Sequence, residues 1–173
     1  KYINGLYAYW DALRGRFNQM LLENCASGGR RMDYEMQSRA HSYCRDDAQM
    51  SPHCEELCQN ITLNSTAYIP FTGGETFTVA KHDDYGFVSC VAAGTVFTPT
   101  DFGFLFREPF TDADLKWFND MYRIADRVRP FYMGDFYALT EPAVDSSEIW
   151  CAWQCDDPVA KAGFFIAFRR AQC

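Results

Sequence analysis

The sequence predicts an α/β fold that is followed by a small antiparallel sheet. In the first part of the chain, a helical pattern, a short apolar run, a second helical pattern and a second apolar run follow one another. This order is typical of a parallel sheet whose strands are joined by helices. After Pro130, apolar residues alternate with polar ones, which is typical of antiparallel strands. The change of period divides the chain into residues 1–129 and residues 130–173.

The composition of the chain excludes some classes of function. The 173 residues are 48% hydrophobic and 17% aromatic, as in globular proteins, and they are enough to bury one hydrophobic core. The net charge of −7 argues against nucleic acid, which proteins bind through basic surfaces. No run approaches the about 18 apolar residues of a membrane-spanning helix. We therefore expect neither nucleic acid nor a membrane as a partner.

The first four elements are predicted from apolar spacing. Residues 5–17 form a helical pattern, because their apolar residues recur at steps of three and four. A buried strand is predicted at residues 20–23, a short helix at residues 32–40 and the next strand at residues 41–45. Helix and strand thus alternate over this part of the chain.

Residues 50–96 are predicted to add a helix and two strands. A helical segment begins near Pro52 and extends to residue 60. Residues 61–71 are rich in β-branched and aromatic side chains, which favour a strand. Residues 87–96 are a further strand candidate, although their alanine-rich middle is equally compatible with a helix.

A long helix with clear start and stop signals precedes the change of period. Thr111 and Asp114 have the spacing of a capping box, apolar residues follow at helical steps, and Pro130 ends the pattern. Three strands of an antiparallel sheet are then predicted at residues 131–139, 148–155 and 163–168.

Eight cysteines raise the question of disulfides or a metal. The pairs Cys54/Cys58 and Cys151/Cys155 lack the spacing and the nearby histidines of common zinc sites. We expect structural thiols, with disulfides as the main alternative, and neither a metal nor a cofactor.

Small and polar residues follow two successive predicted strands. Cys25, Gly28 and the next glycine come after the first strand, and Arg45, Asp46 and Asp47 come after the second. The carboxyl ends of parallel strands meet at one edge of a sheet, so these residues are predicted to line one side of a polar pocket. Paired glycines allow the backbone to approach a ligand closely.

Residues 25–33, CASGGRRMD, resemble the Cys-(Ser/Ala)-(Ser/Gly)-Gly-Gly-x-Arg-x-Asp signature of family 36 glycoside hydrolases, the microbial α-galactosidase (melibiase) type. Residues 38–49 are similar to the family's segment that leads into the acid/base strand, where Trp-x-Ser-Asp is usual. The resemblance continues weakly to the end of the chain. It implies the second half of a (β/α)8 TIM barrel, followed by part of a small antiparallel β-sandwich, with the first half of the barrel before Lys1.

The resemblance also implies site roles. Retaining glycosidases use a nucleophile and a general acid/base, both carboxylates. Asp47 matches the family's acid/base aspartate and Asp46 the serine before it, whereas the residues alone are also compatible with two solvated loop carboxylates. Cys25 and Gly28 would contact the sugar, and Asp46 and Arg45 are the further substrate-binding candidates. Arg45 would also orient Asp47 or hold its ionised form. Cys44 stands where the family usually has an aromatic residue.

The family's nucleophile lies in a Lys-Trp/Tyr-Asp-x-Asn strand, which is not found in this sequence. We therefore expect an inactive fragment of a parent enzyme that hydrolyses terminal α-galactosides or related oligosaccharides. A homo-oligomer is one option for the parent. The alternatives are a galactosyl-transferring variant, a non-catalytic carbohydrate-binding or structural relative, and an unrelated α/β domain in which the motif is a coincidence.

Overall fold

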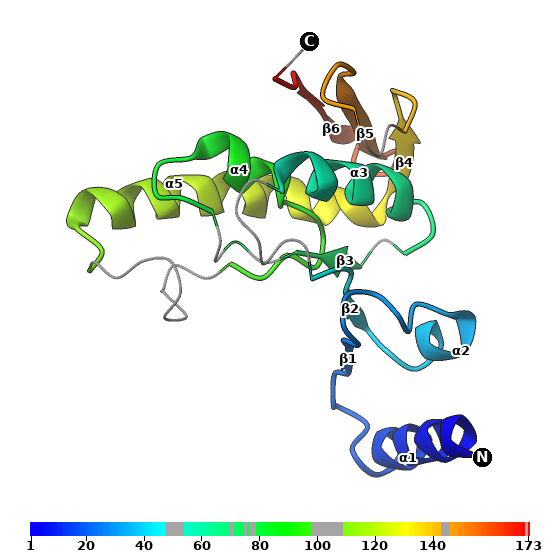
Figure 1. Cartoon of the computed structure of the whole chain (residues 1–173). Coiled ribbons are helices and arrows are strands. Elements are labelled where there is room, and N and C mark those ends of the chain that lie inside the picture. Colours follow the sequence, from blue (N-terminus) through cyan, green and yellow to red (C-terminus); the bar gives the residue numbers. More distant parts are fainter. Residues whose placement is uncertain are drawn as a thin grey trace.

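The structure, a computed structural model, describes residues 1–47, 54–69, 71–74, 76, 79–97, 109–142, 146–171 and 173. Its helices accompany two three-stranded sheets, of which one is parallel in the order β1-β2-β3 and the other antiparallel in the order β4-β5-β6 (Figure 1). The change of strand type that the sequence places near residue 130 is therefore present. The predicted half of a (β/α)8 barrel and the predicted part of a β-sandwich stay predictions.

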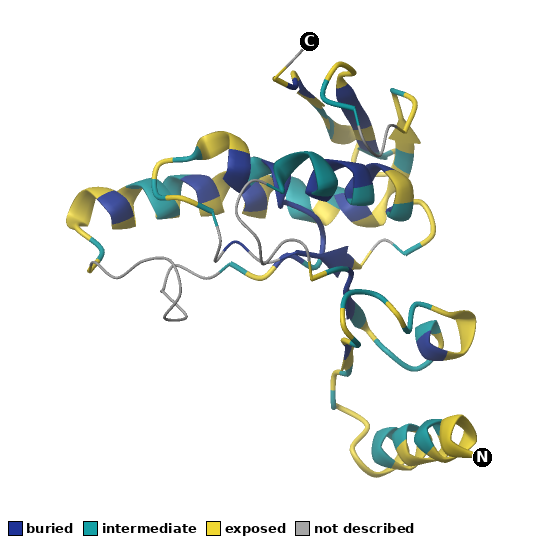
Figure 2. Cartoon of the chain, viewed as in Figure 1, coloured by how far each residue is buried: buried dark blue, intermediate teal, exposed yellow. Residues whose placement is uncertain are grey.

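The first four elements occur in the predicted order: α1 (Tyr2–Arg16), β1 (Glu23–Asn24), α2 (Tyr34–Gln37) and β2 (Ser42–Cys44). Helix α1 lies at one end of the molecule and has no buried residue (Figures 1 and 2). It is attached through Arg39, whose Nε and Nη2 donate to the Asp11 carboxylate at 2.9 and 3.1 Å and whose guanidinium lies over the Tyr7 ring. Polar contacts rather than apolar burial thus hold α1 in place.

The strand predicted over residues 61–71 is wrong. Helix α3 (Glu55–Ser65) extends through its first half, and the strand β3 (Thr72–Gly73) begins only after it; residues 50–53 of the predicted helix lie outside the described residues. The hydroxyls explain the error. Thr62, Ser65 and Thr66 each donate to the carbonyl four residues earlier, at 3.0, 2.6 and 2.7 Å. Threonine favours strands by propensity, but here the hydroxyls of both threonines are satisfied within a helix.

The strand candidate at residues 87–96 is a helix at its start. Helix α4 (Asp84–Ser89) begins at Asp83, whose carboxylate accepts the Gly86 N–H at 2.9 Å. Only the end of the segment runs beside β3. Gly94 N donates to Thr72 O at 3.1 Å, and Val96 bonds both Gly74 O and Thr76 N, at 2.9 and 3.1 Å. One residue that bonds two positions on its neighbour in this way is the pattern of a parallel ladder.

The last helix and the three antiparallel strands are present, although residues 131–133 of the first predicted strand belong to a 3-10 helix. Helix α5 (Asp112–Val128) has the predicted capping box between Thr111 and Asp114. The 3-10 helix η2 (Arg129–Met133) contains Pro130 and leads into the sheet. The strands of this sheet are β4 (Asp135–Ala138), β5 (Cys151–Asp157) and β6 (Ala162–Phe168).

One hydrophobic core crosses the predicted boundary at residue 130. Trp153 and Tyr132 are completely buried, and the Tyr132 hydroxyl donates to Val91 O at 2.9 Å. The cluster contains residues from α3, α4, α5, η2, β5 and β6: Leu63, Phe87, Val91, Ala93, Met121, Ala125, Tyr132, Cys151, Trp153, Cys155 and Phe168. The antiparallel sheet is therefore packed on α3, α4 and α5. The division into two domains stays a prediction.

Helix α3 buries polar side chains, and a buried arginine after β6 satisfies them. Gln59 and Asn60 are almost inaccessible. The Arg170 guanidinium donates to Gln59 Oε1 at 3.2 Å, to Asn60 Oδ1 at 2.7 Å and to Ser146 O at 2.8 Å. Buried polar groups are costly unless they are hydrogen-bonded, so this contact is what permits a polar helix in the interior.

Replacing Arg170 with methionine should lower the free energy of unfolding by about 2–5 kcal/mol, because two buried acceptors lose a charged donor. Urea denaturation measures the change. Arg169→Met is the matched control: its guanidinium is exposed and donates only to Cys173 O among the contacts described, so we expect a change within about 0.5 kcal/mol. Equal effects of the two substitutions would contradict the assigned role of Arg170.

Asp114 joins the start of α5 to the residues before α4. Its carboxylate accepts from Thr111 N at 2.8 Å, from His82 Nε2 at 2.8 Å and from Lys81 Nζ at 3.2 Å. The hydrogen bond from the Thr111 backbone is the largest cause that holds the pKa of Asp114 below its ordinary value. The ionised carboxylate therefore contributes stability above its unfolded-state pKa of about 3.9, and this contribution is lost as the pH falls below that value.

Asp114→Asn should lower the urea midpoint at neutral pH, and the difference from the wild type should shrink as the pH falls below about 4. Asp112→Asn is the control, since that exposed carboxylate lies in the same helical turn without these contacts. A difference that is constant with pH would show that the charge of Asp114 does not stabilise the fold.

Candidate functional site

The two segments singled out in the sequence meet at the carboxyl edge of the parallel sheet. Glu23 pairs with Ser42 and Asn24 with Tyr43, so Cys25 and Cys44 come next in register on neighbouring strands. Neighbouring residues in register point to the same face of a sheet. The cysteine of the glycine motif therefore lies beside the last residue of β2.

The turn after β1 packs directly on the segment after β2. Gly28 and Gly29 have φ values of +70° and +78°, a region that side chains rarely adopt. A Cβ on Gly28 would lie 2.7 Å from Asp47 N, and one on Gly29 would lie 2.5 Å from Arg45 O. The glycines are thus required for the close approach of the two segments. The Asn24 amide fixes the far side of the turn by donating to Arg31 O at 2.8 Å.

Two thiols and a carboxylate converge at this edge. The Sγ atoms of Cys25 and Cys44 and a carboxylate oxygen of Asp47 all lie within 4.8 Å of one another. Cys25 and Asp47 are exposed, whereas Cys44 is buried and its thiol lies 3.8 Å from Asp46 O. The structure therefore brings together Cys25, Gly28 and Asp47, as the sequence predicts. It adds Cys44 to this group. The sequence did not indicate Cys44, because its spacing from Cys25 matches no known motif.

Arg45 points away from this group. Its side chain is buried against α3, where Nη1 donates to Thr62 Oγ1 at 2.7 Å and Nη2 to Cys58 O at 3.3 Å. Successive residues of a strand point to opposite faces, which separates Arg45 from Cys44. The structure gives Arg45 a role in holding α3. A role in orienting Asp47 or binding substrate stays a prediction, without a supporting contact in the described part of the chain.

Asp46 is half-buried between Arg45 and Asp47. Its backbone lies against the turn, since a Cβ on Gly28 would come within 3.2 Å of Asp46 Cα. Its predicted contact with substrate is not tested by these geometries. The structure shows that the backbone of Asp46 packs against the glycine turn.

A second group of thiols, centred on Cys58, lies at the place where Arg45 contacts α3. Cys54 Sγ lies 3.9 Å from Cys58 Sγ, and Cys90 hydrogen-bonds to Cys58. The hydrogen bonds from Cys54 and Cys90, together with the Arg45 charge, lower the pKa of Cys58 and favour its thiolate. Cys58 and Cys90 are buried, and only Cys54 is partly exposed. All eight cysteines carry thiols rather than disulfides.

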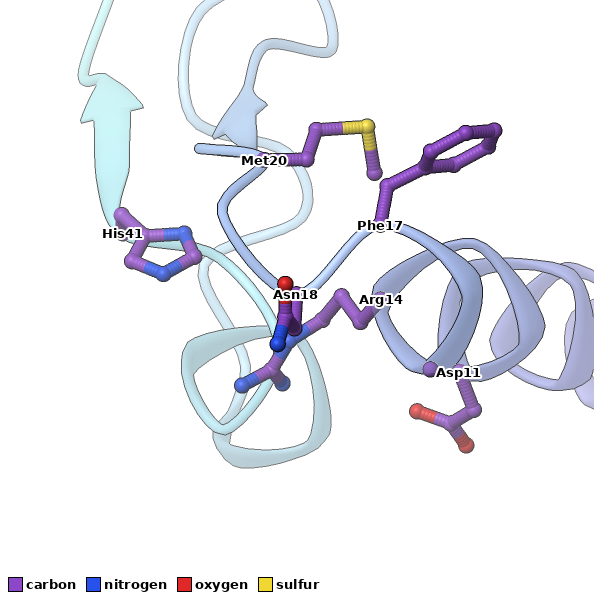
Figure 3. Close-up of a pocket in the computed structure, with 7 residues that line it drawn as sticks. Asp11, Arg14, Phe17, Asn18, Met20 and His41 are labelled. Atoms are coloured by element: carbon purple, nitrogen blue, oxygen red, sulfur yellow. The ribbon is translucent and has the colours of Figure 1, made fainter.

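A pocket of about 430 Å³ lies at the opposite edge of the parallel sheet. Figure 3 shows Asp11 and Arg14 on α1, and Met20 and His41 on the segments that lead into β1 and β2. His41 is exposed and accepts a hydrogen bond from Leu22 N at 3.0 Å. Binding residues of parallel α/β enzymes gather at the carboxyl ends of the strands, so this pocket is not the candidate site.

No family model, curated protein or solved structure gives a significant match to the chain. Among the described residues, no helix combines the length and the apolar character needed to cross a bilayer. The geometry of the site therefore carries the functional argument together with the sequence motif.

Mild oxidation with diamide should join Cys25 to Cys44, because the parallel register places the two residues side by side and brings their sulfur atoms within reach. Non-reducing peptide mapping after alkylation detects the cross-link. Gly28→Ala should lower its yield by displacing the turn from Asp47, whereas Gly5→Ala, with no atom within 4 Å of the new Cβ, should not. Cys25 recovered only as an unmodified thiol would contradict the convergence.

Proposed function

We propose that this chain carries the acid/base side of a retaining glycoside-hydrolase site of the α-galactosidase type. The observation that supports the proposal best is the convergence of Cys25, Gly28 and Asp47 at one sheet edge. The signature residues and the acid/base candidate are separate in the sequence. Their meeting at the carboxyl ends of adjacent parallel strands is the arrangement that a barrel glycosidase requires.

The strand order also supports the proposal. β1, β2 and β3 are neighbours in chain order and parallel, and residues 94–96 run parallel beside β3. A (β/α)8 barrel is built from consecutive strands that are adjacent and parallel in this way. Four such segments amount to half of a barrel, and the second half of a barrel is what the resemblance implies.

Asp47 is the proposed general acid/base. Its side chain is exposed at the edge, where it can protonate the leaving oxygen and then deprotonate the attacking water. The Cys25 thiol and the Gly28 backbone are proposed to contact the sugar beside it. The family's nucleophile motif is not found in these 173 residues, so the proposal assigns one carboxylate of the catalytic pair to this chain.

The proposed substrates are terminal α-galactosides, either aryl galactosides or oligosaccharides. Transfer of galactose to a second sugar instead of water would use the same residues, because both outcomes start from a covalent glycosyl intermediate. No cofactor enters the proposal.

The test uses the gene product that contains this chain and compares wild type with Asp47→Ala on α-galactosides. We expect a loss of about 10²–10⁴-fold in kcat/KM for substrates with poor leaving groups, because these need protonation most. The loss should be smaller for activated aryl α-galactosides, and added azide should restore part of the activity.

Asp126→Ala is the matched control, since this carboxylate is exposed on α5, remote from the sheet edge in sequence and without a role in the site. Its activity should equal that of the wild type. Equal activity in Asp47→Ala and wild type would refute the assignment of Asp47. Binding of galactosides without turnover by the wild type would instead favour the non-catalytic relative.

A further inference from the structure

We propose that Cys25, Cys44 and Asp47 form a binding site for a thiophilic divalent cation, with Zn²⁺ as the best match. The three donor atoms lie within 4.8 Å of one another although they come from two different segments. No spacing motif in the sequence indicates this group, because Cys25 and Cys44 are neighbours only through the strand pairing.

The donor geometry fits the coordination of zinc. With Zn–S distances of about 2.3 Å and Zn–O distances of about 2.1 Å, the donors around a tetrahedral ion lie about 3.6–3.8 Å apart. The three atoms therefore have to close by about 1 Å at most. Cys25 and Asp47 are exposed, so their side chains have room to rotate towards an ion, while the buried Cys44 provides a donor at the end of β2.

The donor set selects the class of metal. Thiolates favour Zn²⁺ and similar ions over Mg²⁺ and Ca²⁺, which prefer oxygen donors. Binding converts both thiols to thiolates and releases two protons to the solvent, while Asp47 binds as its carboxylate. Three protein ligands leave the fourth position of a tetrahedral ion for water.

The other thiol group is a poorer site for a cation. Cys58 lies between Cys54 and Cys90, but the Arg45 guanidinium donates to Cys58 O and adds a positive charge there. A second positive ion beside this guanidinium would be repelled at short range. Substitutions in the Cys58 group can therefore serve as controls for substitutions in the proposed metal site.

The test is a titration of the chain with Co²⁺, followed by thiolate-to-cobalt charge-transfer absorption in the near ultraviolet. We expect the band to saturate at one ion per chain and to disappear when Zn²⁺ displaces the cobalt. Cys25→Ser should reduce the band by about half per bound ion and weaken binding by about tenfold or more. Asp47→Asn should weaken binding similarly but keep the intensity per bound ion.

Cys54→Ser is the matched control and should leave the titration unchanged. Cys25, Cys54 and Asp47 are each at least partly accessible, so the three substitutions do not disturb the core. A titration that lacks the thiolate band, or that depends on Cys54 rather than on Cys25, would overturn the metal site.

The consequence for catalysis rests on the proposed function. In the gene product that contains the chain, Zn²⁺ should inhibit hydrolysis by occupying Asp47, and Cys25→Ser should raise the inhibitory concentration by about tenfold. If cobalt binds as expected but galactosides are not hydrolysed, the proposed function fails and the metal site stands. If hydrolysis depends on Asp47 but no thiolate band is seen, the metal site fails and the proposed function stands.

Discussion

The fold depends on two buried arginines that hold α3 from two different sheets. Arg45, after β2, donates to Thr62 and to the Cys58 carbonyl. Arg170, after β6, donates to Gln59 and Asn60. Helix α3 is too polar to be held in the interior by apolar contacts alone, and its buried amides and hydroxyls would be costly without charged donors. The two guanidiniums thereby connect the parallel sheet to the antiparallel one through a single helix.

The contact between Arg45 and α3 also fixes the geometry of the candidate site. Arg45 is the first residue after β2, and its side chain is committed to α3. Because successive strand residues alternate between faces, docking of Arg45 on the helix side directs Cys44 to the other side. The glycine turn after β1 then rests on the backbone of residues 45–47. Residues 44–47 therefore both hold α3 and form part of the candidate site.

The sequence predicted those parts of the fold in which local signals and packing agree. The capping box at Thr111 and the alternation after Pro130 both specify the observed elements. Prediction failed over α3, because Thr62 and Thr66 have strand propensity but donate their hydroxyls to carbonyls of the helix backbone. The segment is helical because it is buried against Arg45 and Arg170. These contacts are made by residues outside the segment, so its local sequence does not indicate them.

The candidate site was likewise predictable only as far as local motifs indicate it. The glycine motif and Asp47 could be placed at one edge, since parallel strands end together and glycines permit close approach. The orientation of Arg45 and the inclusion of Cys44 could not, because both follow from which face of β2 each residue occupies once α3 is docked. A register, unlike a motif, is set by pairing between strands.

The two proposals for this edge exclude each other at Asp47. As a general acid, Asp47 has to carry a proton and face the leaving oxygen of a sugar. As a metal ligand beside two thiolates, it has to be ionised and turned towards Cys25 and Cys44. One carboxylate cannot do both at once, so an ion bound here competes with protonation instead of assisting it. Cys44 is what makes the competition possible, because its buried sulfur is a soft donor within 4.8 Å of the Asp47 carboxylate.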